Sequence, residues 1–241
     1  MDAEDWQTLV KKLAPCGRLR FALNHGNVVL VQRSYDGQAK GITVDLANEL
    51  CRHLGVEPEF RHYERAGDVS SSAAADEWDI CFLAVDPLRA KTITFTEPYV
   101  AIEGCFLVRD GCEAGAAVDV DRLGLKIGVT KASAYSLFLK REAKGAAIVE
   151  FPTAEETFEA LDTGKVDGLA GVRKAMEQFR DRRSGLRVIQ EPFMSIGQAM
   201  GLPAGRPEAA DFLLRYVTEI KANGFVSTVL ERSGEADLIV P

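Results

Sequence analysis

Residues 126–170, KIGVTKASAYSLFLKREAKGAAIVEFPTAEETFEALDTGKVDGLA, decide the fold class of this chain. Apolar runs typical of strands occupy 126–130, 147–151 and 166–170, and helical segments run from about 133 to 141 and from 153 to 162. Thr153 and Glu156 have the spacing of a capping box, and Gly164 follows the second helix as a stop signal. Strands that alternate with helices in this way predict βαβ units around a mostly parallel sheet.

The same alternation continues outside this segment. Expected strands lie at 18–23, 58–63, 79–85, 105–108 and 186–190, and expected helices begin at Gly41 and Pro207. The Gly and Ala content of residues 109–120 makes them the best linker candidate. We therefore predict an α/β protein with two lobes, each a central mostly parallel sheet flanked by helices. Lobe 1 comprises residues 1–107 and 196–241, lobe 2 comprises residues 108–195, and a ligand cleft is expected between them at the ends of the strands.

The composition excludes several kinds of partner. The chain has 241 residues, of which 46% are hydrophobic, and it carries a net charge of −7. This charge gives no overall basic surface for nucleic acid or an anionic membrane, so we expect neither as a partner. No run approaches the roughly 20 apolar residues that cross a bilayer. The first residues, MDAEDWQTLVKKLAPCGRLRF, contain no basic stretch followed by an unbroken apolar core, so no export signal is predicted and we expect a soluble chain.

The cysteine and histidine patterns predict neither a metal nor a cofactor. Five cysteines make an odd count without a CxxC pair, and the expectation is inert thiols; a bridge between Cys105 and Cys112 has no support from the pattern. His25, His53 and His62 are set apart along the chain without metal-ligand spacing.

A series of short motifs resembles a known family. They are Gly41-Ile-Thr-Val-Asp45-Leu-Ala, Trp78-Asp79-Ile, Pro87-Leu-Arg89-Ala followed by Phe95-Thr-Glu-Pro98-Tyr99, Lys126-Ile-Gly128-Val-Thr-Lys, and Gly164-Lys-Val-Asp167-Gly. In this order they resemble the family 3 solute-binding proteins, which are the receptors of polar amino-acid ABC transporters. The resemblance implies a type II periplasmic-binding-protein-like fold, hinge closure around a small ligand, a monomer, and an ABC transporter permease as a candidate partner. It also implies a periplasmic location, whereas the absence of a visible export signal leaves a cytoplasmic one open.

Two positions carry the expected carboxylate site. Arg89 matches the arginine that holds the ligand's carboxylate in the family, and a planar guanidinium offers two parallel donors to two carboxylate oxygens. The alternative role for Arg89 is an ordinary ion pair within the protein. Ser133 and Tyr135 lie where relatives begin a second-lobe helix with Gly-Thr or Gly-Ser, and a helix N-terminus favours anions. Ser133 is therefore expected to contact the ligand and cap the helix, with capping alone as the alternative.

The loop before Arg89 departs from the family. Phe82, Leu83 and Ala84 occupy the segment that receives the ligand's amino group in relatives, but apolar residues replace the serines and the loop is about two residues shorter. This part of the expected pocket therefore differs from that of the family. Phe82 is expected either to pack on an apolar ligand body or to belong to the core.

The expected ammonium end of the ligand also departs from the family. Val172 stands where amino-acid binders carry an aspartate, and Asn24 and Asn27 stand where relatives bear an acid and an aromatic residue. Neutral side chains cannot neutralise a buried ammonium, so we doubt a standard α-amino acid bound in the usual way. Arg173, if it reaches the cleft, would suit a dicarboxylate or another anion; otherwise it is a solvated charge. For the asparagines, the alternative is ordinary turn chemistry.

Catalysis and sensing are the competing hypotheses. A dehydratase acting on cyclohexadienyl acids shares the fold, but it needs a general acid, and Glu103 is the only nearby candidate. No GxSxG, P-loop, HExxH or paired acid motif is present. We therefore predict a small-carboxylate-binding protein that is not an enzyme. A ligand-sensing module without a transport role remains the alternative.

Overall fold

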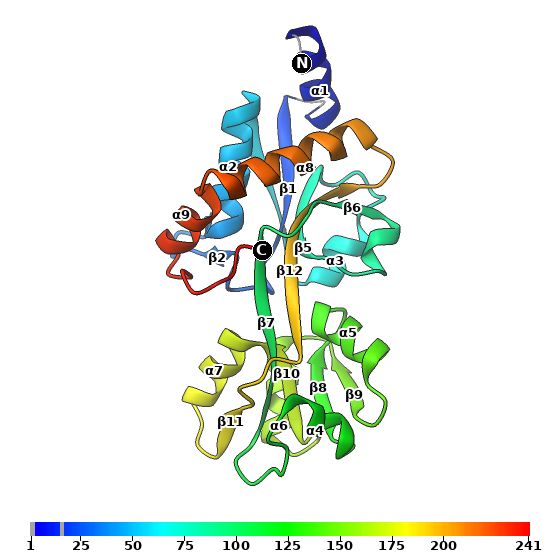
Figure 1. Ribbon diagram of the computed structural model, residues 1–241, viewed down its shortest axis with the longest axis vertical. Coiled ribbons are helices and arrows are strands. Elements are labelled where there is room, and N and C mark those ends of the chain that lie inside the picture. The colour runs from blue at the N-terminus through cyan, green and yellow to red at the C-terminus, as the bar shows by residue number, and fades with distance from the viewer. Residues whose placement is uncertain (1–2, 15–16) are drawn as a thin grey trace. The chain divides into compact units, whose positions relative to one another are not determined.

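The computed structural model describes residues 3–14 and 17–241, and their contacts divide the chain into two compact units. Unit 1 comprises Met1–Ala101 and Gly197–Pro241, and unit 2 comprises Ile102–Ile196. In Figure 1, unit 1 combines the blue and cyan elements with the orange and red helices, whereas unit 2 is green to yellow. The chain passes between the units within β7 (Val100–Arg109) and β12 (Met194–Pro203).

The sheet of unit 1 is parallel at its centre. Its strands are β1 (Arg18–Asn24), β4 (Glu57–Tyr63), β5 (Ile80–Ala84) and β6 (Ile93–Phe95), together with the end of β12. β1 lies between β4 and β5 and runs parallel to both, while β12 runs antiparallel to β5 and β6. The middle of β1, Phe21 to Leu23, is buried and apolar, as is typical of a central parallel strand, whereas Arg18 and Asn24 at its ends are polar.

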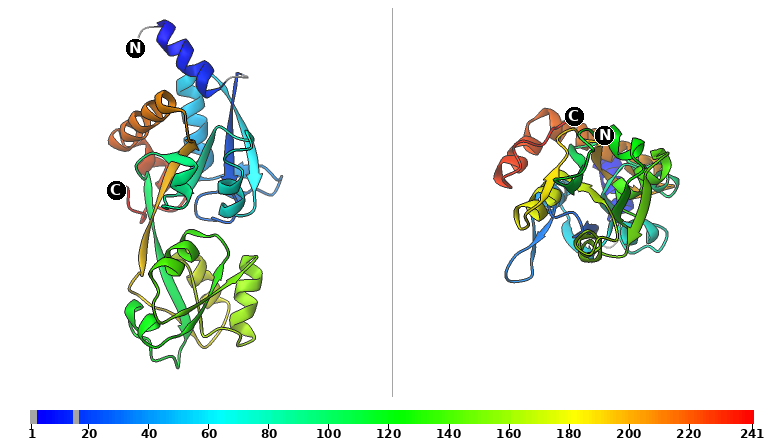
Figure 2. Two further views of the ribbon diagram at one scale, coloured as in Figure 1. Left: turned by 90° about the vertical axis from the view of Figure 1, so that its right-hand side faces the viewer. Right: turned by 90° about the horizontal axis from the view of Figure 1, so that it is seen from below.

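Helices cover the sheet of unit 1 (Figure 2). They are α1 (Ala3–Leu13), α2 (Ile42–Leu54), α3 (Ala66–Ser71), the 3₁₀ helix η1 (Arg89–Lys91), α8 (Pro207–Ala222) and α9 (Phe225–Arg232); a short hairpin is formed by β2 (Gln32–Arg33) and β3 (Ala39–Lys40). α2 buries Leu46, Leu50 and Leu54 on one face and ends at Gly55, whose φ of 71° is left-handed. Glycine fits this position because it has no Cβ to clash there.

Unit 2 repeats the architecture, as the alternating sequence pattern predicts. Its strands are β8 (Lys126–Thr130), β9 (Ala147–Phe151), β10 (Gly168–Val172) and β11 (Leu186–Val188), together with most of β7, and its helices are α4 (Ala117–Arg122), α5 (Ala134–Glu142), α6 (Ala154–Asp162) and α7 (Arg173–Asp181). β8 runs parallel to β9 and β10, whereas β7 pairs antiparallel with β10 and β11. Thr153 caps α6 by accepting the N–H of Glu156 at 3.1 Å, which confirms that cap.

The side chains of β7 divide the core of unit 2 between the two faces of its sheet. Cys105 and Leu107 join one apolar cluster, and Phe106 and Val108 join another. This division follows from the two-residue period of a strand. Both faces of the sheet are therefore covered.

The prediction that residues 109–120 form the linker is wrong. They lie inside unit 2, where Arg187 Nη2 donates to the carbonyl oxygens of Cys112 and Ala114 at 2.8 and 2.7 Å. The Gly and Ala content of the segment predicts a linker, but Ala114 is fully buried in unit 2. The segment is therefore a fixed turn leading from β7 into α4.

The cysteines described by the structure, Cys51, Cys81, Cys105 and Cys112, are free thiols. Burial raises the pKa of the Cys51 thiol to about 12 and that of Cys105 to about 11, so neither ionises readily. Cys16 lies outside the described residues. None of the helices in the described ranges has both the length and the apolar character that a membrane span requires.

Candidate functional site

Arg89 opens the 3₁₀ helix η1 in unit 1, directly after the loop that leaves β5. Only 3% of the residue is exposed, and its Nη1 donates to the carbonyl oxygen of Ala84 at 3.0 Å. Burial lowers the pKa of this guanidinium, while the nearby charge of Asp86 acts in the opposite direction. Asp86 also holds the turn, because its Oδ1 accepts the N–H of Leu88 at 2.8 Å. Arg89 is thus a fixed, buried cation, and its contact with a carboxylate ligand stays a prediction.

The β5 residues expected beside the ligand have their side chains in the interior of unit 1. The ring of Phe82 stacks on Phe21 at a centroid distance of 6.0 Å and meets Tyr99 edge-on. Leu83 belongs to the core cluster around Trp78. Core packing, the alternative for Phe82, accounts for these contacts. The carbonyl oxygen of Ala84 is the acceptor for Arg89.

Two apolar residues that shortly precede Arg89 in the chain are exposed. Val85 is 45% exposed and Leu88 is 56% exposed. They flank Asp86 and Pro87 in the loop, so the surface nearest Arg89 along the chain is apolar. The only signal available was the apolar character of the loop, which does not say which of its side chains point outward.

Asn24 and Asn27 form the turn at the end of β1. The Oδ1 of Asn24 accepts the N–H of Gly26 at 3.1 Å, so Asn24 performs the turn chemistry expected of it as the alternative. A side chain on Gly26 would bring its Cβ within 2.8 Å of the Glu64 carbonyl oxygen, which explains the glycine. The Oδ1 of Asn27 is buried and accepts no hydrogen bond within the described part of the chain. Asn27 therefore retains an unsatisfied acceptor, which is uncommon in a folded protein.

His25 and His62 are set apart along the chain but lie together in the structure. His25 Nε2 lies 2.8 Å from His62 Nδ1, and the two rings stack at 5.1 Å. The parallel pairing of β1 with β4 brings them together. Burial, together with the charges of Arg33 and His62, lowers the pKa of His25, and only Glu64 opposes this. Residues 3–14 and 17–241 contain no group of three or more His, Cys, Asp or Glu residues that could hold a metal.

Ser133 caps α5 in unit 2, as predicted. Its Oγ accepts the N–H of Ser136 at 3.1 Å. The first N–H groups of a helix have no acceptor within the helix, so those of Ala134 and Tyr135 point out of its first turn. Ala132, just before the cap, has a φ of 57°, a left-handed conformation that costs energy for any residue with a Cβ. This turn is therefore locally strained and rich in donors.

Glu150 was not expected at this helix terminus. Its Oε1 accepts from Ser136 Oγ at 2.6 Å and from the N–H of Ala132 at 3.4 Å, and its Oε2 accepts from Lys140 at 3.0 Å. These donors and the Lys140 charge lower the pKa of Glu150, against the effect of burial. A carboxylate already occupies one side of the turn. Tyr135 packs half-buried on the core of unit 2, and burial raises the pKa of its phenol.

Arg173 has an arrangement that neither expectation described. It begins α7, its Nε donates to Glu103, its Nη2 donates to the Gln190 carbonyl oxygen at 2.6 Å, and Glu177 lies 3.8 Å away. The interpretation as a solvated charge is therefore wrong, because the guanidinium is only partly exposed and is paired within unit 2. Glu103, the candidate general acid, is held by the same contact. Val172 caps α7 without a side-chain bond.

Comparison with known proteins shows the family. The description of bacterial extracellular solute-binding proteins, family 3, matches residues 20–234. The chain belongs to this family. This confirms the resemblance carried by the sequence motifs and identifies the chain as a solute-binding protein of the kind that works with ABC transporters.

Known family 3 members share the fold at low sequence identity. The L-cystine-binding protein TcyJ of Escherichia coli K12 is 23% identical over 206 residues, which cover 84% of this chain and 77% of that protein. The glutamine-binding protein GlnH of Bacillus subtilis 168 is 21% identical over 199 residues, covering 78% and 70%. A binding component from Wolinella succinogenes, solved in complex with lysine, has a TM-score of 0.76 at 22% identity and covers 90% of this chain and 95% of that one. The predicted two-lobed α/β fold is thereby confirmed.

Proposed function

We propose that this family 3 protein binds a small solute through a carboxylate group, which Arg89 receives in lobe 1 and the first turn of α5 receives in lobe 2. Outside the cytoplasm, the protein delivers the bound solute to an ABC transporter in the membrane. The observation that carries the proposal is the buried guanidinium of Arg89 in the loop after β5. The Ala84 carbonyl oxygen and the Asp86 charge hold this guanidinium in place, and its planar fork suits the two oxygens of a carboxylate.

The first turn of α5 supports the same ligand group. Ser133 already caps the helix through the N–H of Ser136, which leaves the N–H groups of Ala134 and Tyr135 as donors. The positive end of a helix dipole adds to their attraction for an anion. The turn therefore offers neutral donors that complement the charge of Arg89.

The rest of the solute is proposed to be uncharged or polar. Asn24, Asn27 and Val172 offer no negative charge to an α-ammonium, and Glu103 is occupied by Arg173. The relatives' names include binders of cystine, glutamine and histidine, so an amino-acid-like compound or an organic acid is the class to test first. We propose binding without catalysis, since Glu103, the candidate general acid, is held by Arg173.

A thermal-shift screen of amino acids, keto acids, dicarboxylates and aromatic acids tests this function. A solute at 100 times its Kd stabilises the protein by about 2.7 kcal/mol. Arg89→Ala should weaken a hit by more than about ten-fold, because truncating one partner of a buried charge pair costs roughly 2–5 kcal/mol. Arg89→Lys keeps the positive charge but loses the two parallel donors of the guanidinium, so its affinity for the hit should lie between those of the wild type and Arg89→Ala.

Arg61→Ala is the matched control, since Arg61 lies in the same unit and pairs with Glu59 at its surface. A hit that binds Arg89→Ala and Arg89→Lys as tightly as wild type contradicts the carboxylate assignment. Incubating the hit with the protein and finding a converted product would contradict binding without catalysis.

A further inference from the structure

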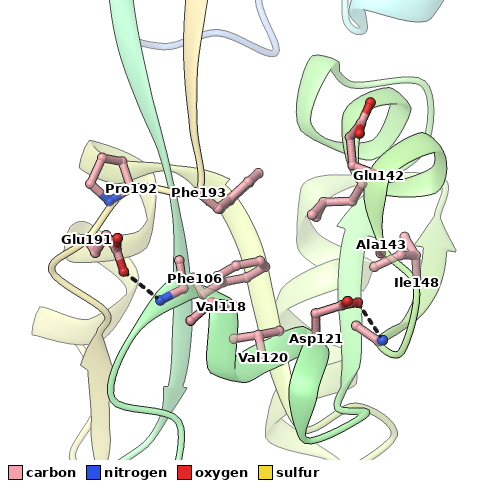
Figure 3. A pocket seen from close by; sticks show the side chains of 13 residues that line it. Phe106, Val118, Val120, Asp121, Glu142, Ala143, Ile148, Glu191, Pro192 and Phe193 are labelled. Atoms are coloured by element: carbon pink, nitrogen blue, oxygen red, sulfur yellow. Dashed lines mark hydrogen bonds between the residues drawn. The ribbon is translucent and has the colours of Figure 1, made fainter.

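Unit 2 contains a pocket of about 330 Å³ that none of the predicted site residues lines (Figure 3). It is framed by α4, the C-terminal end of α5, β7 and the segment before β12. Pockets for small organic molecules begin at about 300 Å³. The size therefore suits a ligand of roughly one ring and a short chain.

The floor of the pocket is aromatic and aliphatic. The rings of Phe106 and Phe193 stack at a centroid distance of 4.3 Å, and Phe193 is fixed by its N–H, which donates to the Gly104 carbonyl oxygen at 2.9 Å. Leu139 and Ile148 complete this surface. Aromatic faces carry partial negative charge, so such a floor accepts both apolar groups and cations.

The rim carries acids and, among the described residues that line the pocket, no lysine or arginine. The acids are Asp121, Glu142 and Glu191. Glu142 bonds Arg141 at 3.0 Å and points away from Asp121 in Figure 3. Asp121 and Glu191 lie on opposite sides of Val118 and Val120 in the same view, so each places an acid on one side of the pocket.

Backbone donors hold both of these acids in place through one oxygen each. The Oδ1 of Asp121 accepts the N–H groups of Lys144, Gly145 and Ala146 at 2.8 to 2.9 Å, and these bonds lower the pKa of Asp121, aided by the Lys144 charge. The Oε2 of Glu191 accepts the N–H of Ala117 at 3.2 Å. One oxygen of each carboxylate therefore remains to accept from a ligand, with the side chain already ordered.

We propose that this pocket binds a small organic cation of the arylalkylammonium class. The aromatic ring lies on Phe106 and Phe193, the ammonium group meets the second oxygen of Glu191, and Asp121 adds negative charge on the other side of Val118 and Val120. The site lies entirely in unit 2 and shares no residue with the proposed carboxylate site, so it stands or falls independently of the proposed function.

The probes are 2-phenylethylammonium, its neutral analogue 2-phenylethanol and the anion 3-phenylpropanoate. Methyl resonances of Val118, Val120, Leu139 and Ile148, followed by NMR, report directly on the pocket. We expect saturable shifts with the ammonium, several-fold weaker binding of the alcohol, and no shift of these methyls with the carboxylate. Because 2-phenylethylammonium has no carboxylate, its binding does not depend on Arg89.

Glu191→Gln separates charge from shape, since its amide oxygen can still accept from Ala117. We expect about three-fold weaker ammonium binding and unchanged alcohol binding, the size of a surface ion pair. Glu113 is an exposed acid of unit 2 that does not line the pocket, so Glu113→Gln should change neither the ammonium affinity nor the alcohol affinity. Ala143→Phe, which fills the pocket, should abolish both.

Three results with the wild-type protein or Glu191→Gln would overturn the proposal, and a fourth concerns Arg89→Ala. They are equal affinity of the wild-type protein for the ammonium and the alcohol, an unchanged ammonium affinity in Glu191→Gln, or saturation by the ammonium while the pocket methyls stay in place. Loss of ammonium binding in Arg89→Ala with the pocket methyls unmoved would place the ligand at the carboxylate site and equally reject this one.

Discussion

Arg20 contacts two acids whose surroundings differ, and this provides a sharp test of the forces in unit 1. Asp79 is 1% exposed and accepts from the N–H of Arg20 at 3.0 Å, from its Nε at 2.9 Å and from its Nη2 at 2.8 Å. Asp76 is 79% exposed and accepts from Arg20 Nη2 at 2.7 Å. Replacing each acid by asparagine keeps its shape and removes its charge.

The expected costs follow from burial. Breaking a buried ion pair by neutralising one partner costs roughly 3–5 kcal/mol, because the other charge stays desolvated. In Asp79→Asn, Arg20 still has Asp76 as a partner and is partly exposed. We therefore expect a loss of unfolding free energy at the lower end of that range, about 3 kcal/mol. Asp76→Asn should change stability far less, because water and salt already screen an exposed pair.

Urea unfolding followed by tryptophan fluorescence measures this difference. Both tryptophans of the chain, Trp6 and Trp78, belong to unit 1, so the signal reports on that unit. With a slope of about 2 kcal/mol per molar urea, Asp79→Asn should lower the midpoint by about 1.5 M. Equal midpoint shifts for the two variants, or a loss below about 1 kcal/mol for Asp79→Asn, would refute the reasoning from burial.

Three further variants test local features. Ser133→Ala should lower the unfolding free energy of unit 2 by about 1 kcal/mol because α5 loses its cap, measured by circular dichroism in urea; no loss would contradict the cap. Ala132→Gly should raise it by about 0.5–1 kcal/mol by relieving the left-handed backbone, and a loss would argue against strain. The lowered pKa of His25 means that the unfolded chain binds more protons, so stability should fall as the pH drops below about 6.5. His25→Asn should flatten that fall between pH 7 and 5.5, and an unchanged slope would contradict the assignment to His25.

Local patterns predicted most of the fold. The helix after Gly41 and the cap at Thr153 follow from residues within one or two turns of each other, and the structure contains both. The strand predicted at 166–170 begins instead at Gly168. The N–H of Lys165 still bonds the Ala160 carbonyl oxygen at the end of α6, so the chain leaves the helix later than its apolar residues suggest.

The charged contacts could not be predicted because they depend on strand pairing across the chain. His25 and His62 meet because β1 and β4 pair in parallel with Asn24 opposite Tyr63. Glu103 reaches Arg173 because β7 and β10 pair antiparallel, with Gly104 opposite Val172. No spacing within a segment encodes such a register.

These pairings narrow the proposed solute. Arg173 and Glu103 neutralise one another, so together they offer no net charge to either end of a ligand. Arg173 holds one oxygen of Glu103, so an ammonium would meet a carboxylate whose charge is already balanced, and a second carboxylate would meet an arginine that already has an anionic partner. Arg89 gains more from an anion than an exposed arginine would, because burial has already weakened its hydration. A monocarboxylate with an uncharged polar or apolar body, resting against Val85 and Leu88, is therefore the solute that we infer these residues favour.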